Sequence, residues 1–353
     1  MQNLKQLLII VLLLLFSVCS IFAQKKVALH SNGTTTFFAG ASPYVDAYNA
    51  AIDGDTIYLP GGTFSTPSSI QKRIVVYGVG HHPDSSAVLG ETIITGGMFF
   101  YPATSKSHFE GLMFSNGSIS YYGIADSIVL RRCYLTSINF GNYASRGNQI
   151  IENVIVGSID GGNSVNTVIS NNILKRDGDN VITKFSNNAW ICNNIIVGTG
   201  YYSNYNNRFV LSVITDCLID NNIILNEGSG PNFRIENIIH STVSNNTFKN
   251  NVFNHDPTNA TNIWENNYFG VSSDAIFTNY TGLVFDYAED FHLLNPASYT
   301  GSTGNEVGIY GGYTPVKLGM IPENPHFQLK NIASETDENG ELNIQIQVES
   351  QDY

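Results

Sequence analysis

The chain of 353 residues carries few charges: 17 Lys and Arg against 29 Asp and Glu give a net charge of −12, and charged residues make up 13%, about half the usual share. Asparagine fills part of this gap with 41 residues, of which 21 lie between positions 151 and 250. Because 42% of the residues are apolar, the chain can bury a core, which excludes wholesale disorder. An acidic chain without clusters of Lys and Arg does not suit a nucleic-acid partner.

Residues 1–23 have the pattern of a secretory signal peptide. Lys5 precedes ten uninterrupted apolar residues at 7–16, and smaller residues lead to Ala23, after which we expect cleavage. The apolar stretch is shorter than the roughly 20 residues that cross a bilayer, and we expect no membrane span in the mature chain. The sequence therefore predicts an exported protein, extracellular, on the cell surface or periplasmic.

A phrase of one polar residue, two Asn and two apolar residues recurs about every 22 positions. The copies lie at 170–174, 192–196, 220–224, 244–248 and 265–269, with degenerate forms at 110–114, 131–135 and 152–156. A fixed period of this length indicates a solenoid. The flanking columns are apolar, and Asn doublets suit tight turns because Asn tolerates the left-handed conformation. We expect stacked Asn side chains to hydrogen-bond from coil to coil.

A second polar column lies five positions before the first Asn and predicts another turn of each coil. Its members are Ser127, Asn148, Asn166, Asn188, Asp216 and His240. We interpret His240 as a turn residue of this column rather than a catalytic one.

Two solenoids have this period, the leucine-rich repeat and the parallel β-helix. The Leu framework of the former is missing, and Ile and Val dominate, so we predict an all-β, right-handed parallel β-helix with coils about 4.8 Å apart. The β-helix domain would cover residues 24–320: a cap at about 24–52 with a short helix at 43–51, coils at about 53–270, and a closing segment at 271–320. Residues 321–353 form an acidic tail of net charge −6, in which the alternation at 342–348 predicts a strand that folds back along the solenoid or pairs with a partner.

Three cysteines remain after the signal peptide, at Cys133, Cys192 and Cys217. Their spacing fits no zinc motif. In the repeat register, Cys192 and Cys217 lie three columns apart, about 10 Å along a strand, beyond the roughly 7 Å limit for a disulfide. We therefore predict isolated thiols, with Cys133 replacing an Asn in the turn column.

Several segments resemble the pectin-lyase-like right-handed β-helix family. Residues 54–64 (GDTIYLPGGTF) are similar to its entry coil and 74–80 (IVVYGVG) to its second coil, and residues 109–114 and the Asn-Asn coils continue the likeness. Residues 290–293 and 307–312 resemble the closing segment of bacterial secreted members. The resemblance covers roughly residues 27–320 and implies the fold, whereas lyases, hydrolases, epimerases, adhesins and inactive scaffolds all share that fold.

Candidate catalytic residues are few. Asp177 and Asp179, beside Arg176, are the best local cluster for sharing a sugar or a cation, but we favour the simpler interpretation of a solvated Asp-Gly turn after a strand. The sequence predicts no cofactor; calcium would be needed only if the chain were a lyase, because that chemistry gathers carboxylates around a hard cation.

Candidate ligand-binding residues are the tyrosines of long inter-repeat stretches, where exposed rings beside amides could stack on sugars: Tyr121, Tyr122, Tyr201, Tyr202 and Tyr205. We therefore expect an exported scaffold that binds a surface or extracellular polysaccharide without cleaving it. The alternative is a polysaccharide lyase or glycoside hydrolase acting on an acidic polysaccharide. Three or more carboxylates converging with Arg or Lys on one sheet face would favour the alternative, and a sheet face of Asn, Ser, Thr and Tyr without such a cluster would favour the scaffold.

Overall fold

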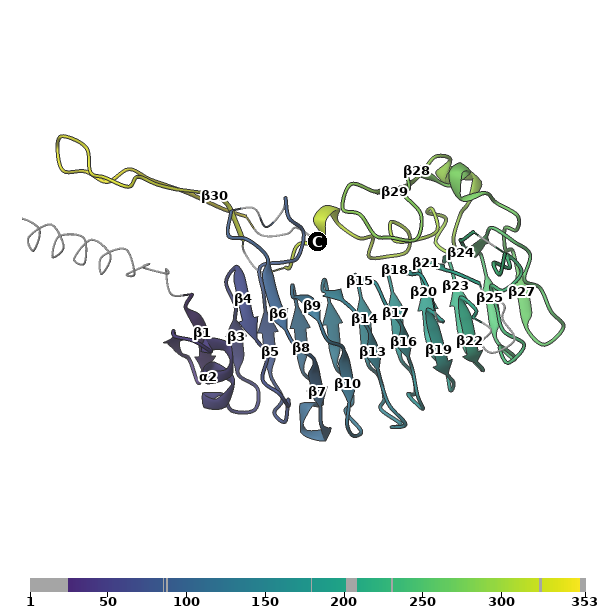
Figure 1. Cartoon of the computed structure of the whole chain (residues 1–353), viewed down its shortest axis with the longest axis horizontal. Helices are drawn as coiled ribbons and strands as arrows, with labels where there is room; N and C mark the ends of the chain where they lie inside the picture. Colours follow the sequence, from purple (N-terminus) through teal and green to yellow (C-terminus); the bar gives the residue numbers. More distant parts are fainter. Residues whose placement is uncertain are drawn as a thin grey trace, which may run out of the picture.

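The computed structural model describes residues 25–84, 86, 88–178, 180–200, 208–229, 231–323 and 326–349. The expected signal peptide and the candidate residues Asp179, Tyr201, Tyr202 and Tyr205 lie outside them. The described chain winds into a right-handed parallel β-helix (Figure 1), which confirms the expected fold. No helix among the described residues is long and apolar enough to cross a membrane.

Three sheets run along the solenoid, and from β5 to β22 each coil contributes one strand to sheet A, then to sheet B, then to sheet C. Sheet A contains β1 (Val27–Ser31), β2 (Thr34–Phe38), β3 (Thr56–Tyr58), β5 (Val75–Tyr77), β8 (His108–Glu110), β11 (Val129–Arg131), β14 (Gln149–Ile151), β17 (Val168–Ser170), β20 (Trp190–Cys192), β23 (Leu218–Asp220), β25 (Thr247–Lys249) and β27 (Ile263–Glu265). Sheet B contains β4 (Gly62–Ser65), β6 (Thr92–Thr95), β9 (Met113–Asn116), β12 (Tyr134–Leu135), β15 (Val154–Ile155), β18 (Ile173–Arg176), β21 (Ile195–Gly198), β24 (Ile223–Asn226) and β26 (Val252–Phe253). Sheet C contains β7 (Met98–Phe100), β10 (Ile119–Tyr121), β13 (Ile138–Asn139), β16 (Ile159–Asp160), β19 (Ile182–Phe185) and β22 (Leu211–Ile214).

The Asn doublets form the turn from sheet A to sheet B. The first Asn of a doublet takes a positive φ, as in Asn193 at 54° and Asn221 at 59°. The second Asn of the inner coils is buried, and its Nδ2 donates to the Oδ1 of the next coil at 2.9–3.0 Å, in a ladder of Asn153, Asn172, Asn194, Asn222 and Asn251 that ends on the half-buried Asn267. The predicted ladder is confirmed.

The three cysteines are free and buried, as predicted. Cys133 stands in the ladder position, where its backbone N–H donates to Asn153 Oδ1 at 2.9 Å. Burial raises the pKa of Cys133 to about 12 and that of Cys217 to about 11, so these thiols stay protonated near neutral pH.

Two copies of the repeat were placed in the wrong register from the sequence. Glu152, with φ 56°, occupies the first position of its turn, so Ile150 rather than Ile151 points inward. The doublet at 245–246 belongs to the turn from sheet C to sheet A, and the matching copy in the sheet A to sheet B turn is Asn250-Asn251. That coil carries Asn doublets at both corners, which the periodicity could not distinguish. His240 follows a bridge between Leu211 and Ile239 beside sheet C and is not in the Asp216 column.

Both ends of the core are covered. At the first coil, α2 (Pro43–Ala50) buries Tyr44 and Tyr48, confirming the expected capping helix. At the last coil, the Trp264 ring stacks on Phe248 with centroids 4.4 Å apart.

The described residues also form short 3-10 helices, namely η1 (Pro102–Thr104), η2 (Ser273–Ala275), η3 (Pro296–Ser298) and η4 (Leu318–Met320).

Residues 271–320, the closing segment, turn back over the outer face of sheet B (Figure 1), with β28 (Phe277–Asn279) paired to β29 (Asp290–Leu293). Its apolar residues and the outward residues of sheet B form a second hydrophobic core. Ile195 and Ile223 on the sheet are fully buried there, together with Phe277 and Phe291 of the closing segment. The closing segment therefore seals this face.

The tail forms a two-stranded antiparallel hairpin of β30 (His326–Ile332) and β31 (Ile344–Glu349). The predicted strand is present, but it pairs within the tail instead of folding back along the solenoid. The hairpin projects away from the coils (Figure 1).

Candidate functional site

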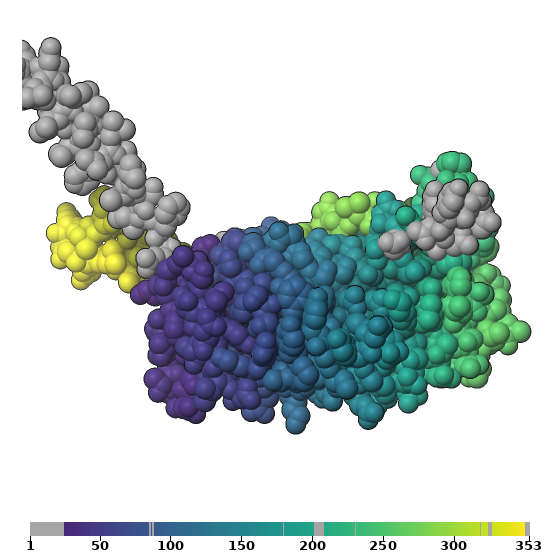
Figure 2. All heavy atoms as spheres, turned by 60° about the horizontal axis from the view of Figure 1, so that its bottom comes forward, coloured from purple at the N-terminus to yellow at the C-terminus, as the bar shows by residue number. Residues whose placement is uncertain are grey.

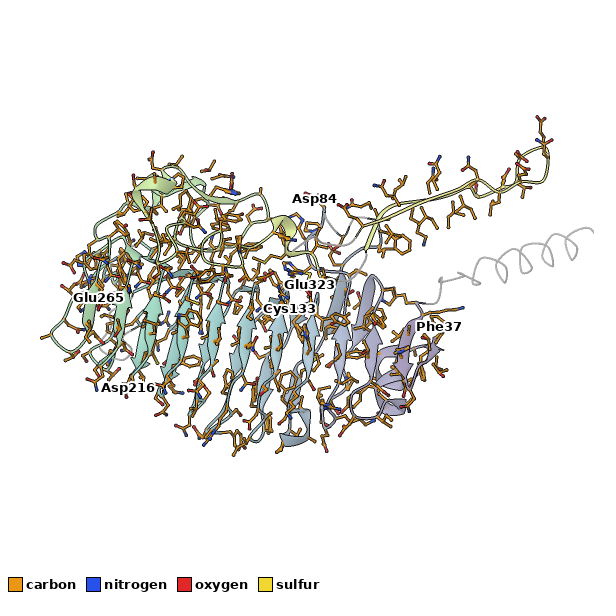
Figure 3. The ribbon with its side chains drawn as sticks, turned by 180° about the vertical axis from the view of Figure 1, so that it is seen from behind. Phe37, Asp84, Cys133, Asp216, Glu265 and Glu323 are labelled. Carbon is orange, nitrogen blue, oxygen red and sulfur yellow. The ribbon has the colours of Figure 1, made fainter. Side chains whose placement is uncertain are left out.

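The corner between sheets C and A is open to solvent. Figure 2, which brings the lower edge of Figure 1 forward, shows a continuous surface built of the coils, with the closing segment appearing only behind its upper edge. Asp216 marks this lower edge in Figure 3, on the opposite side of the solenoid from Cys133 and Glu323. A ligand could therefore reach this corner without displacing the closing segment.

A groove of about 510 Å³ runs along this corner, and we call it the Trp190 groove. One wall is the corner column Asn188, Asp216 and Asn245, one residue from each coil, all exposed and all with positive φ. The other wall is the outward row of sheet A, where Trp190, Leu218 and Thr247 lie in register. Amides and a carboxylate therefore face an aromatic ring across a groove whose polar groups repeat about every 4.8 Å, the coil spacing.

Trp190 is 43% exposed, and its orientation is fixed. Its Nε1–H donates to Asp220 Oδ1 at 2.6 Å. Burial raises the pKa of Asp220, while the bond from Trp190 partly lowers it. An exposed ring with a bonded indole N–H presents a rigid apolar surface beside polar groups, which suits stacking on a sugar.

The sequence reasoning did not select Trp190. A signal was present, because Ile191 lies in the apolar column before the Asn doublet of its coil, and alternation along a strand then turns Trp190 outward. Val168 and Leu218 occupy the same outward row in the neighbouring coils, so an aromatic residue stands out there.

A second aromatic surface lies at the end of sheet C. Tyr122 is 52% exposed, and its ring packs edge-on against Phe99 at 5.1 Å and stacks with Tyr101 at 5.9 Å. The outward row of sheet C continues from Phe99 with Ser120 and Asn139, and then with Asp160, Thr183 and Ser212. Asn, Ser and Thr make up most of this row, which also contains Phe99 and Asp160, and its members Thr183 and Ser212 are buried.

Tyr121 does not belong to that surface. Its side chain points into the coil, is 3% exposed and stacks on Phe140 at 4.3 Å. Neighbouring residues of a strand point to opposite faces, so Tyr121 and Tyr122 could not both face a ligand.

In the candidate cluster, Arg176 bonds within its own loop and Asp177 bonds to the neighbouring coil. Arg176 Nη1 donates to Asn180 O at 3.0 Å, and Asp177 Oδ1 accepts from the Thr199 hydroxyl at 3.0 Å. Across the described residues, no three His, Cys, Asp or Glu side chains are grouped so that they could hold a metal ion. The observed contacts of Arg176 and Asp177 are those of residues that order a turn.

Three carboxylates and two arginines converge at the sheet A to sheet B corner, where the sequence did not place a cluster. Arg132 Nε donates to Glu152 Oε2 at 2.6 Å, and its Nη1 lies 3.4 Å from Glu110 Oε1. Arg131 pairs with Glu152 at 2.8 Å and with Glu323 at the start of the tail. Figure 3 shows Glu323 beside this corner.

This cluster is closed rather than open to a substrate. The side chains of Glu110, Arg132 and Glu152 are 1%, 5% and 3% exposed. Burial alone would raise the pKa of Glu110, but hydrogen bonds from His108 and from the backbone N–H of Glu323 bring it below its usual value. The network therefore anchors residue 323 onto the coils, and its charges are already paired.

Comparisons with known proteins show little likeness in sequence. No family model matches the chain, and no curated protein matches it. In structure it is similar to pectate lyase Pel9A, at 13% identity over 80% of this chain and 91% of that one, with a TM-score of 0.42. It is also similar to the Dettilon tailspike protein, at 14% identity over 79% of this chain and 67% of that one, with a TM-score of 0.26.

Proposed function

We propose that this chain is an exported scaffold that binds an extracellular or cell-surface polysaccharide in the Trp190 groove without cleaving it. The observation that carries the proposal is the exposed Trp190 ring, bonded to Asp220 at 2.6 Å and facing a column of amides across the groove. Apolar sugar faces stack on such rings, and sugar hydroxyls exchange hydrogen bonds with Asn and Asp side chains.

The repeat of the coils also supports an extended ligand. Asn188, Asp216 and Asn245 present one polar side chain for each coil, and the coil spacing of about 4.8 Å is close to the length of one sugar unit. Because Asp216 is the charged member of this column and the whole chain is acidic, a neutral polysaccharide suits the groove better than an acidic one.

The test is binding of the purified mature chain to a panel of neutral and acidic polysaccharides, followed by affinity electrophoresis of variants. We expect Trp190→Ala to weaken binding at least about tenfold, which corresponds to 1.4 kcal/mol. Tyr313→Ala is the matched control, because Tyr313 is 91% exposed in the closing segment and lies outside the groove lining. Tyr122→Ala reports separately on the aromatic surface at the end of sheet C.

Two results would contradict the proposal. Retention of full affinity in Trp190→Ala would remove the groove as the binding site. Release of reducing or unsaturated ends from any polysaccharide, abolished by Asp177→Ala, would instead make the chain a hydrolase or lyase.

A further inference from the structure

The C-terminal hairpin exposes an apolar face. The register places Ile332 opposite Ile344 and Lys330 opposite Ile346, so these side chains share one face with Val348. Ile344, Ile346 and Val348 are 53%, 53% and 52% exposed. A lone two-stranded hairpin is at best marginally stable in water, so pairing with a further strand would stabilise it.

The two edges of the hairpin differ. On β30, the register shifts between Phe327 and Leu329, which marks a bulge, and Lys330 lies next to it. Both a bulge and a lysine on an edge strand discourage pairing with a further strand. On β31, residues 344–348 read Ile-Gln-Ile-Gln-Val, without charge, Pro or Gly. The outer edge of β31 is therefore the one left open to another strand.

The backbone groups of this edge can be assigned. The Ala333 N–H donates to Asn343 O at 2.9 Å, so residue 343 directs its polar groups toward β30. Because these groups alternate in an antiparallel ladder, Ile344, Ile346 and Val348 direct theirs outward. The sheet contains only β30 and β31 among the described residues.

The outer edge of β31 is self-complementary. When a second copy of residues 344–348 runs antiparallel beside the first, Ile346 lies opposite Ile346, Ile344 opposite Val348 and Gln345 opposite Gln347. Apolar side chains then meet apolar ones on one face, and Gln meets Gln on the other. Such an interface has two-fold symmetry.

We propose that two copies of this chain associate through β31, forming a four-stranded antiparallel sheet from the two hairpins. The tail leaves room for it, since the hairpin projects away from the solenoid (Figures 1 and 3). The acidic residues Glu335, Asp337, Glu338 and Glu341 lie between the strands, outside the paired edge, so the edge itself remains uncharged.

A cysteine placed on the two-fold axis tests the register. In Ile346→Cys, the two copies of residue 346 face each other with Cα atoms about 5.5 Å apart, within the range of a disulfide. The matched control is Ile344→Cys, on the same strand and face and equally exposed, whose copies would lie about 14 Å apart along the strands. The native cysteines are buried and should give little background.

We expect the full mature chain to have twice its monomer mass by light scattering, and Ile346→Cys to form a cross-linked dimer under mild oxidation. Ile344→Cys alone should stay uncross-linked but should cross-link when mixed with Val348→Cys. Ile346→Lys should halve the mass, whereas Leu329→Lys, which adds the same charge to β30, should leave it unchanged. A monomer at all concentrations, or equal cross-linking of the 344 and 346 variants, would overturn the proposal.

Discussion

Asn194 shows what one side chain contributes to this fold. It is fully buried, its Nδ2 donates to Ile169 O at 2.8 Å and to Asn222 Oδ1 at 2.9 Å, and its Oδ1 accepts from Asn172. A buried amide is tolerated because each of its polar atoms has a partner. The ladder also lowers the demand for charge, since amides supply the polarity of the turns from residue 153 to residue 267.

His81 is a buried residue with a different consequence, because it is held in the neutral form. Burial, with a smaller contribution from His82, lowers its pKa to about 3. Its Nδ1 lies 3.0 Å from the hydroxyl of Tyr287 in the closing segment, and its Nε2 is buried without a partner. Protonation would therefore place a charge between the coils and the closing segment.

We predict that His81 makes stability fall as the pH is lowered from about 6.5 toward 3. In this window the unfolded chain binds one more proton than the folded chain, so the free energy of unfolding decreases by up to about 1.4 kcal/mol for each pH unit. Above pH 6.5 both states are neutral at this residue and its contribution is constant. The measurement is urea unfolding across the pH range.

The control for this prediction is His81→Gln, which keeps a polar side chain near Tyr287 but cannot titrate. We expect a flatter stability profile between pH 3 and 6.5. An unchanged slope in this variant would assign the acid sensitivity to other groups, such as the neighbouring His82, whose pKa burial also lowers.

Elements could be predicted from the sequence where each coil repeats a local pattern. The Asn doublets and apolar columns identified the strands of sheets A and B and the turn between them, because those requirements recur in every coil. The register failed at residues 245–246, where Asn occupies both corners of one coil. Only the pairing with neighbouring coils distinguishes the two corners.

A buried ion pair that no repeat indicates joins the closing segment to sheet B. Lys175 of β18 contacts Glu289 through Nζ at 2.6 and 2.8 Å, and both side chains are fully buried. Burial lowers the pKa of Lys175, and Glu289 opposes that shift. Glu289 also accepts from the backbone N–H groups of Thr281 and Asp286, so the pair joins the sheet to a loop of the closing segment.

We predict that Lys175→Met destabilises the protein by about 3–5 kcal/mol, because it leaves a buried carboxylate without its cation. The double variant Lys175→Met with Glu289→Gln should lose less stability than the sum of the single variants, because neither charge is then left alone. Denaturant unfolding of the four proteins gives the coupling energy. Strict additivity would show that the two charges do not interact.

At the scale of the molecule, the long-range contacts could not be predicted from the sequence. Glu323 reaches Arg131 across 192 positions, and no local pattern brings such residues together. The Trp190 groove was missed for a related reason, since it exists only where three coils align a ring with a column of amides. Tyr122 was predicted to be exposed from its stretch between repeats and is 52% exposed, whereas the same signal selected Tyr121, which is buried.

The closing segment packs against several coils, whereas each coil contacts mainly its neighbours. Ser302 bonds to Asn221 and Ile309 O accepts from Asn171 Nδ2, and Glu323, at the start of the tail, pairs with Arg131, so the chain after residue 270 contacts several coils. A solenoid without such a bridge would open coil by coil from its ends.

We predict that amides of the closing segment and of the coils at 129–226 exchange with deuterium at the same free energy of opening, and that Lys175→Met lowers this free energy equally for both. Native-state hydrogen exchange measures this directly. Closing-segment amides that exchange more than about tenfold faster than those coils, a difference of 1.4 kcal/mol, would show that the segment opens on its own.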